Sequence, residues 1–179
     1  MQLIQTVLKV IIFGVLIILI IVNMLPTTYQ INITAPISKD HPHALKFILS
    51  TKNWVQAINV LESSKIQLLS MQNEEKVGGF VAFNHSRGRV DATLVEKKPH
   101  ELQYHLRFHE EHQARMRIFF QPKTQQITVL IHGEVLSPII GSLNAFLTKY
   151  YLEKIVQTAV NEMNSQLQLQ VMGQETNDN

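Results

Sequence analysis

The chain has 179 residues, with 16 Lys or Arg, 14 Asp or Glu and no Cys, so its formal net charge is +2 at pH 7. A nucleic-acid-binding domain shows clustered Lys and Arg, whereas the basic residues here are dispersed, and we expect no nucleic-acid partner. The lack of cysteine leaves no thiol nucleophile and fits an oxidising compartment without requiring one.

The first 25 residues predict a membrane anchor. Residues 3–25 form an apolar run of 23 positions, and a helix of that length measures roughly 34 Å at about 1.5 Å per residue. That length exceeds the roughly 30 Å hydrocarbon core of a bilayer. We therefore expect residues 1–26 to be a transmembrane anchor that contacts membrane lipid through residues 3–25. The run is interrupted by Gln5, Thr6, Lys9 and Asn23.

The alternative is a cleaved signal peptide, with Lys9 as its basic region and Val10–Val22 as its apolar core. A signal peptidase needs small residues just beyond that core, and Asn23–Pro26 supplies none. Lys9 and the free amino terminus are the positive charges before the span, so the positive-inside tendency puts the N-terminus in the cytoplasm. The C-terminal domain would then be periplasmic or otherwise extracytoplasmic.

Residues 27–172 are predicted to form one domain, and residues 173–179 a disordered tail. Alternation of apolar and polar residues predicts strands, and successive strands with short turns are typical of an antiparallel meander with one apolar face. Pro42 suits the first turn of a helix, with Asp40 or His41 as its cap. In chain order we expect a strand at 29–35, short helices at 43–49 and 54–61, and strands at 64–72, 76–85, 89–96, 101–110, 113–121 and 126–134.

A long helix is predicted after these strands, with Ser137 as its cap and Pro138 in its first turn, running to about Gln170. Apolar residues recur along it every four positions, so we expect it to lie across the apolar face of the sheet and bury both surfaces. These residues are Leu143, Leu147, Tyr151, Ile155, Ala159, Met163 and Leu167.

A strand, two short helices, about six antiparallel strands and a long terminal helix follow the order of the α+β helix-grip fold. Four segments carry further local patterns: Ile31–Pro36, Asn53-Trp54, Glu96–Tyr104 and Ile127–Gly133. In this order, within residues 29–170, they resemble the START-like superfamily (SRPBCC), which includes polyketide cyclases and dehydrases. The chain departs from that family by having Ala57 and Ile58 where a second Trp often stands, and by carrying an anchor.

The resemblance implies a cavity between the concave face of the sheet and the long helix. Its expected wall carries no charge, which suits a hydrophobic guest such as an acyl chain, an isoprenoid or a polycyclic compound. The same side chains could instead fill one another's gaps as ordinary core. The predicted ligand-binding residues are Trp54, Phe83, Leu94, Tyr104, Leu106, Phe108, Ile118, Leu147 and Tyr151.

Polar groups offer little chemistry in this pattern. His105, His109 and His112 lie close in sequence, but their neighbours alternate as on a strand, where His105 and His109 are about 13 Å apart. That separation excludes a shared metal ion, and we predict an exposed polar face with no metal, cofactor or catalytic residue. We expect His85 and His100 at turns, the Gly78-Gly79 pair at a bulge or bend within a strand, and the hydroxyls of Tyr104 and Tyr151 inside the cavity.

Three functions are compatible with this sequence. The first is a membrane-anchored START-like domain that binds a hydrophobic small molecule or lipid. The second is an enzyme of the polyketide cyclase or dehydratase kind, although no acid–base pair emerges from the sequence. The third is a protein-interaction module with a filled core, whose exposed face carries His105, His109, Arg115 and Arg117.

Overall fold

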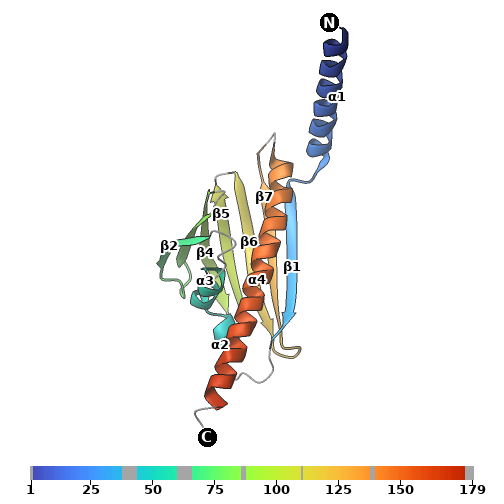
Figure 1. Ribbon diagram of the computed structural model, residues 1–179. Helices are drawn as coiled ribbons and strands as arrows, with labels where there is room; N and C mark the ends of the chain where they lie inside the picture. The colour runs from blue at the N-terminus through green and yellow to red at the C-terminus, as the bar shows by residue number, and fades with distance from the viewer. Residues whose placement is uncertain are drawn as a thin grey trace.

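The computed structural model describes residues 2–37, 44–59, 66–85, 88–109, 111–137 and 140–175, and its elements follow the predicted order (Figure 1). The predicted caps at Asp40 and His41, the helix end at 60–61, the strand start at 64–65 and the Pro138 turn lie outside the described residues. The helices are α1 (Gln2–Met24), α2 (Ala44–Ile48), α3 (Thr51–Asn59) and α4 (Gly141–Glu175), and the strands are β1 (Thr28–Pro36), β2 (Gln67–Gln72), β3 (Phe80–His85), β4 (Gly88–Lys98), β5 (Glu101–His109), β6 (His112–Gln121) and β7 (Gln126–Val135).

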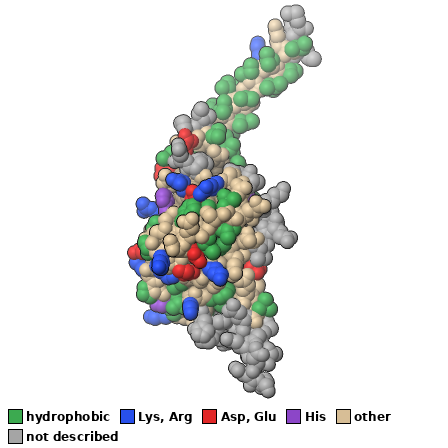
Figure 2. Space-filling view, turned by 90° about the vertical axis from the view of Figure 1, so that its left-hand side faces the viewer, with side chains coloured by type: hydrophobic (Ala, Val, Ile, Leu, Met, Phe, Trp, Pro, Cys, Tyr) green, Lys and Arg blue, Asp and Glu red, His purple; other side chains and the backbone are tan. Residues whose placement is uncertain are grey.

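Most of helix α1 projects beyond the folded domain, and its end lies beside the start of α4 (Figures 1 and 2). Its segment Ile4–Val22 has a mean hydropathy of 2.8, and none of it is buried. It is the one helix in the described part of the chain that is long and apolar enough to cross a membrane, a property that an N-terminal signal sequence shares. Bulky side chains such as Phe13 and Ile18 are more than half exposed, so α1 needs an apolar environment that the folded domain does not supply.

The seven strands form a single antiparallel sheet in the order β1-β7-β6-β5-β4-β3-β2. The first strand returns to pair with the last, so that Ile31 lies opposite Ile131. Helix α4 runs across one face of this sheet (Figure 1), and α3 packs against α4 on the same side. The predicted α+β helix-grip architecture is therefore confirmed.

The strand alternation read from the sequence positions the core correctly. On β1, Tyr29, Ile31, Ile33 and Ala35 are buried while the residues between them are exposed. Helix α4 covers this face with side chains that include Met163 and Leu167, both fully buried. The apolar faces of β1 and α4 therefore bury each other, as the two periodicities predicted.

The predicted stripe along α4 does not stay on one side of the helix. A step of four residues turns about 40° beyond a full turn, so the stripe drifts from solvent into the core. Leu143 is 38% exposed, Leu147 is half-buried and Ala159 is buried. The prediction that Leu143 faces the sheet is wrong for this reason. The helix also continues to Glu175, two residues beyond Gly173, where we expected the tail to begin.

The Gly78-Gly79 pair lies in a turn rather than at a bulge inside a strand. Asn73 and Gly78 have φ angles of 48° and 86°, in the left-handed region that favours glycine and asparagine. The Gly79 N–H donates to the Lys76 carbonyl at 2.8 Å, and β3 begins only at Phe80. Alternation alone did not detect this turn because Val77 continues the apolar pattern of the strand that follows.

Candidate functional site

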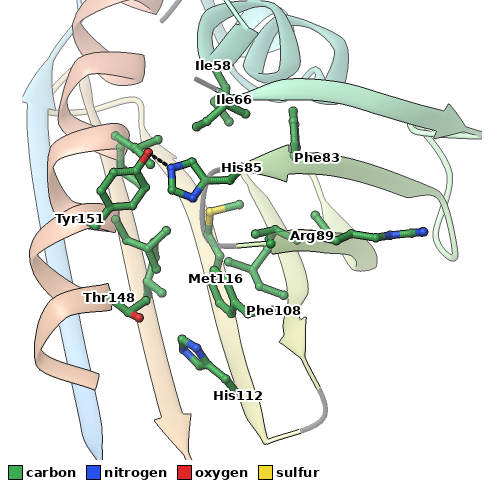
Figure 3. A pocket seen from close by; sticks show the side chains of 18 of the residues that line it. Ile58, Ile66, Phe83, His85, Arg89, Phe108, His112, Met116, Thr148 and Tyr151 are labelled. Carbon is green, nitrogen blue, oxygen red and sulfur yellow. Dashed lines mark hydrogen bonds between the residues drawn. The ribbon is translucent and has the colours of Figure 1, made fainter. Parts of the chain in front are cut away.

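A cavity of about 320 Å³ lies between the sheet and the first four turns of α4 (Figure 3). Its volume is at the lower end of the roughly 300–1,000 Å³ range of small-molecule sites, and most of its wall is apolar. The wall consists of Ile58, Ile66, Phe83, His85, Gly88, Arg89, Val90, Ala92, Leu106, Phe108, His112, Met116, Ile131, Asn144, Thr148, Tyr151, Leu152, Ile155 and Val156.

The period of the strands and of α4 sends these side chains inward. On β5, Leu106 is buried and Phe108 is half-buried, while Arg107 between them is exposed. On α4, Asn144, Thr148, Tyr151 and Ile155 recur at steps of four, three and four residues, which keeps them on one side of a helix. The cavity is thus lined on one side by the inward side chains of the strands and on the other by one side of α4.

The first polar feature of the cavity is a hydrogen bond between Tyr151 Oη and His85 Nε2. Tyr151 comes from α4 and His85 from the end of β3, and the two rings point toward each other with centroids 4.5 Å apart (Figure 3). The bond ties the helix to the sheet across the cavity. An imidazole beside a phenol can also exchange a proton or orient a polar group of a guest.

The second polar feature is His112, which is buried at the α1-proximal end of the cavity. Its Nε2 lies 2.8 Å from Tyr29 Oη, and its ring stacks on Phe108 with centroids 4.2 Å apart and 18° between the planes. Burial raises the pKa of Tyr29 above its ordinary value, so this phenol keeps its proton at neutral pH. His112 is therefore held in place by its hydrogen bond to Tyr29 on β1 and by its stacking on Phe108.

Tyr104 has a structural hydrogen bond rather than an open hydroxyl. Thr51 Oγ1 donates its proton to the Glu74 carbonyl at 2.8 Å. A threonine hydroxyl has a single proton, so the Tyr104 hydroxyl, 2.7 Å away, donates to Thr51 Oγ1. Burial also raises the pKa of Tyr104 above its ordinary value. The proton of Tyr104 thus holds α3 and β5 together.

The sequence-predicted residues divide between two spaces and the packed core. A second, smaller void of about 50 Å³ adjoins Trp54, Tyr104 and Ile118, together with Phe83. Leu94 is buried in the core and Leu147 is half-buried on α4, and neither lines these two spaces. The residues that line the larger cavity are Phe83, Leu106, Phe108 and Tyr151.

Two histidines in the cavity wall were missed by the sequence reasoning. His85 was expected at a turn, but it is the last residue of β3 and shares the inward parity of Val81 and Phe83. His112 was grouped with an exposed polar face, but it begins β6 one residue earlier than predicted and shares the parity of Ala114. Applying the strand parity to His85, the last residue of the predicted strand 76–85, and extending the strand predicted at 113–121 by one residue to His112 would have found both residues.

The opposite face of the sheet carries paired charges. Arg117 Nε lies 2.6 Å from Glu101 Oε1, and this hydrogen bond holds the pKa of the Glu101 carboxyl below its usual range. His105 lies on the same face, where its Nε2 is 3.2 Å from Gln113 Oε1. Within the described ranges, no group of three or more His, Cys, Asp or Glu side chains is arranged to hold a metal ion.

No family model and no curated protein matches this chain, whereas many solved structures share its fold. Major latex-like protein 151 from Panax ginseng aligns with a TM-score of 0.54 and 14% identity, over 78% of this chain and 97% of that one. An uncharacterized protein from Rhizobium leguminosarum aligns with a TM-score of 0.56 and 12% identity, over 79% of this chain and 95% of that one. Ara h 8.0201 aligns with a TM-score of 0.52 and 10% identity, over 78% of this chain and 96% of that one.

The chain has the helix-grip fold. These neighbours share it, which agrees with the fold that the sequence resemblance implies. At these identities the likeness extends to the fold alone. The function of this chain has to be argued from its own cavity and from α1.

Proposed function

We propose that this protein is a membrane-tethered helix-grip domain that binds a hydrophobic small molecule or a lipid in the cavity beneath α4. The observation that carries the proposal is a cavity of about 320 Å³ whose wall is mostly apolar, with a few polar groups. Small-molecule sites have this composition, because apolar walls supply affinity and a few polar groups fix orientation.

The position of the tether supports the same function. Only Leu25, Pro26 and Thr27 separate α1 from β1, which limits the distance between bilayer and domain to about 10 Å. Figure 1 shows α1 joining the domain at the end where α4 begins, and the cavity lies beneath the first turns of α4. A guest leaving the bilayer would thus meet the cavity close to the headgroups. The positive-inside tendency would put this domain outside the cytoplasm.

The decisive experiment is native mass spectrometry of the full chain released from lipid nanodiscs. A defined additional mass, lost on denaturation and identified after extraction, is the expected result. An empty chain that takes up neither phospholipids, fatty acids nor isoprenoids would contradict binding and would indicate that the inward face is packed core. Resistance of the chain to alkaline carbonate extraction tests the anchor separately.

An enzyme is the second candidate, and the His85–Tyr151 pair favours it. These two titratable side chains meet across the cavity from different elements, as an acid–base pair acting on a bound guest would do. Tyr104, the other tyrosine expected inside the cavity, uses its proton in a structural bond. Turnover of an extracted guest by the full chain, lost in Tyr151→Phe, would identify the protein as an enzyme.

A further inference from the structure

We propose that the outward side of the first turns of α4 is a second membrane contact, which docks the domain on the bilayer that holds α1. We call this surface the proximal apolar face, and it consists of Leu143, Phe146 and Tyr150 on α4 together with Leu136 and Ile140, which precede the helix. The inference rests on the proposed anchoring by α1 and adds a specific surface to it.

The first observation is the exposure of bulky apolar side chains on a helix that otherwise follows the rules of packing. Phe146 is 59% exposed and Tyr150 is 71% exposed, while Leu136 just before the helix is 64% exposed. A surface helix of a globular domain normally carries polar residues on its outer side. Here the first turns of α4 are apolar outside as well as inside, and contiguous exposed apolar surface marks an interaction site.

The second observation is the geometry of the helix. Leu143, Phe146 and Tyr150 follow steps of three and four residues, so they share one side of α4. At 100° per residue this side lies about 140° around the helix from Asn144 and Thr148, which line the cavity. The proximal apolar face is therefore not part of the cavity and is available to a separate partner.

The third observation is the fixed position of this face beside the end of α1. The Val135 N–H donates to the Thr27 carbonyl at 2.9 Å, and a Cβ at Gly141 would lie 3.6 Å from Thr27 Cγ2. The start of α4 thus packs on the junction between α1 and β1. From Leu143 to Tyr150 the face extends about 10 Å along the helix, so a modest lean of the domain brings all of it to the headgroup layer.

The composition of the segment favours a bilayer as the occupant. No acidic residue occurs between Glu134 and Glu153, whereas Lys149 is exposed within that stretch, so the first turns of α4 carry no acidic side chain that would repel anionic headgroups. Tyr150 suits the interface in particular, because Tyr and Trp side chains gather at the boundary between hydrocarbon and water, and Phe is typical of the apolar side of helices that lie in that interface. A face that continues from a membrane span, with this composition, matches lipid more closely than a protein partner.

Site-directed spin labelling of the full chain in liposomes of phosphatidylcholine and phosphatidylglycerol tests the proposal. The native chain has no cysteine, so Phe146→Cys and Tyr150→Cys each give one nitroxide position. Gln157→Cys is the matched control, because it is exposed and lies on the same side of α4 about 16 Å further along the helix than Phe146. We expect labels at 146 and 150 to collide several-fold more often with oxygen, relative to a water-soluble nickel chelate, than the label at 157.

A charge variant then separates docking from anchoring. Leu143→Glu combined with Phe146→Glu, both at exposed positions, should return the label at 150 to the aqueous collision ratio, whereas Gln157→Glu should leave it unchanged. If labels at 146 and 150 match the label at 157 while the chain resists carbonate extraction, docking is refuted and anchoring stands. Release of the chain by carbonate would refute the anchor and with it this proposal. Shielding from both reagents would indicate a second copy of the chain and would also overturn it.

Discussion

The hydroxyl of Tyr29 lies 2.8 Å from Nε2 of His112, and both residues are buried. Tyr29 is the second residue of β1, close after the end of α1, whereas His112 begins β6 in the cavity wall. Gly133 lies opposite Tyr29 on β7 and makes room for its ring, because a Cβ there would collide with the ring. The segment that leaves α1 is therefore bonded directly to the candidate site.

Tyr29→Phe should lower the free energy of unfolding by about 0.5–1.5 kcal/mol, because the buried hydrogen bond between Tyr29 and His112 is lost while the ring packing is kept. Chemical denaturation of the full chain in micelles, monitored by the fluorescence of Trp54, the single tryptophan of the sequence, measures this loss. Tyr150→Phe is the matched control, because Tyr150 is 71% exposed, and its effect should stay within about 0.5 kcal/mol. Equal effects of the two variants would contradict the role of the bond.

Alkaline pH should destabilise the fold through two buried tyrosines. Burial raises the folded-state pKa of Tyr29 and of Tyr104 above the ordinary value of about 10, so the unfolded chain loses these protons more easily. Stability is therefore fully present below about pH 10 and falls above it, by up to about 1.4 kcal/mol per pH unit for each tyrosine. Unfolding free energies across this range test the slope, and Tyr104→Phe should remove its share. An unchanged slope in that variant would contradict the assignment.

Leu106→Trp should displace a cavity guest. Leu106 lines the cavity from β5, and a larger side chain there takes up part of a volume of only about 320 Å³. Arg107→Trp adds the same ring at the next residue of the strand, on the exposed face, and should leave binding unchanged. Native mass spectra of both variants released from nanodiscs provide the comparison. Retention of the guest by Leu106→Trp would show that it binds elsewhere.

Tyr151→Phe removes the hydrogen bond to His85 while it retains the ring. We expect a loss of about 0.5–1.5 kcal/mol in the free energy of unfolding and little change in the retention of a guest that has no polar group. A guest with a carbonyl or hydroxyl at this point should be retained less. Denaturation and native mass spectrometry measure the two effects, with Tyr150→Phe as the control. Equal retention of both kinds of guest would show that His85 and Tyr151 do not bind the polar group of the guest.

Local periodicity predicted most of the fold because apolar residues recur on the side of each strand or helix that is buried. The alternation over Tyr29–Ala35 and over Leu102–Phe108 identified strands and their inward faces, which the burial of Ile31 and Leu106 confirms. The same reasoning failed at His85, which the predicted strand 76–85 contained but which we assigned to a turn, and at His112, one residue before the predicted strand 113–121. It failed again along α4, where steps of four residues turn Leu143 out toward solvent.

The sequence by itself determined the apolar span, the order of the elements and the parity of each strand, since these depend on neighbours along the chain. The tertiary structure alone decided that His85 meets Tyr151, that His112 meets Tyr29, and that about 320 Å³ remains unfilled between sheet and helix. Volume and long-range pairing depend on how far apart two packed layers settle, and that distance is set by all of their side chains together. No single segment of the sequence determines this distance.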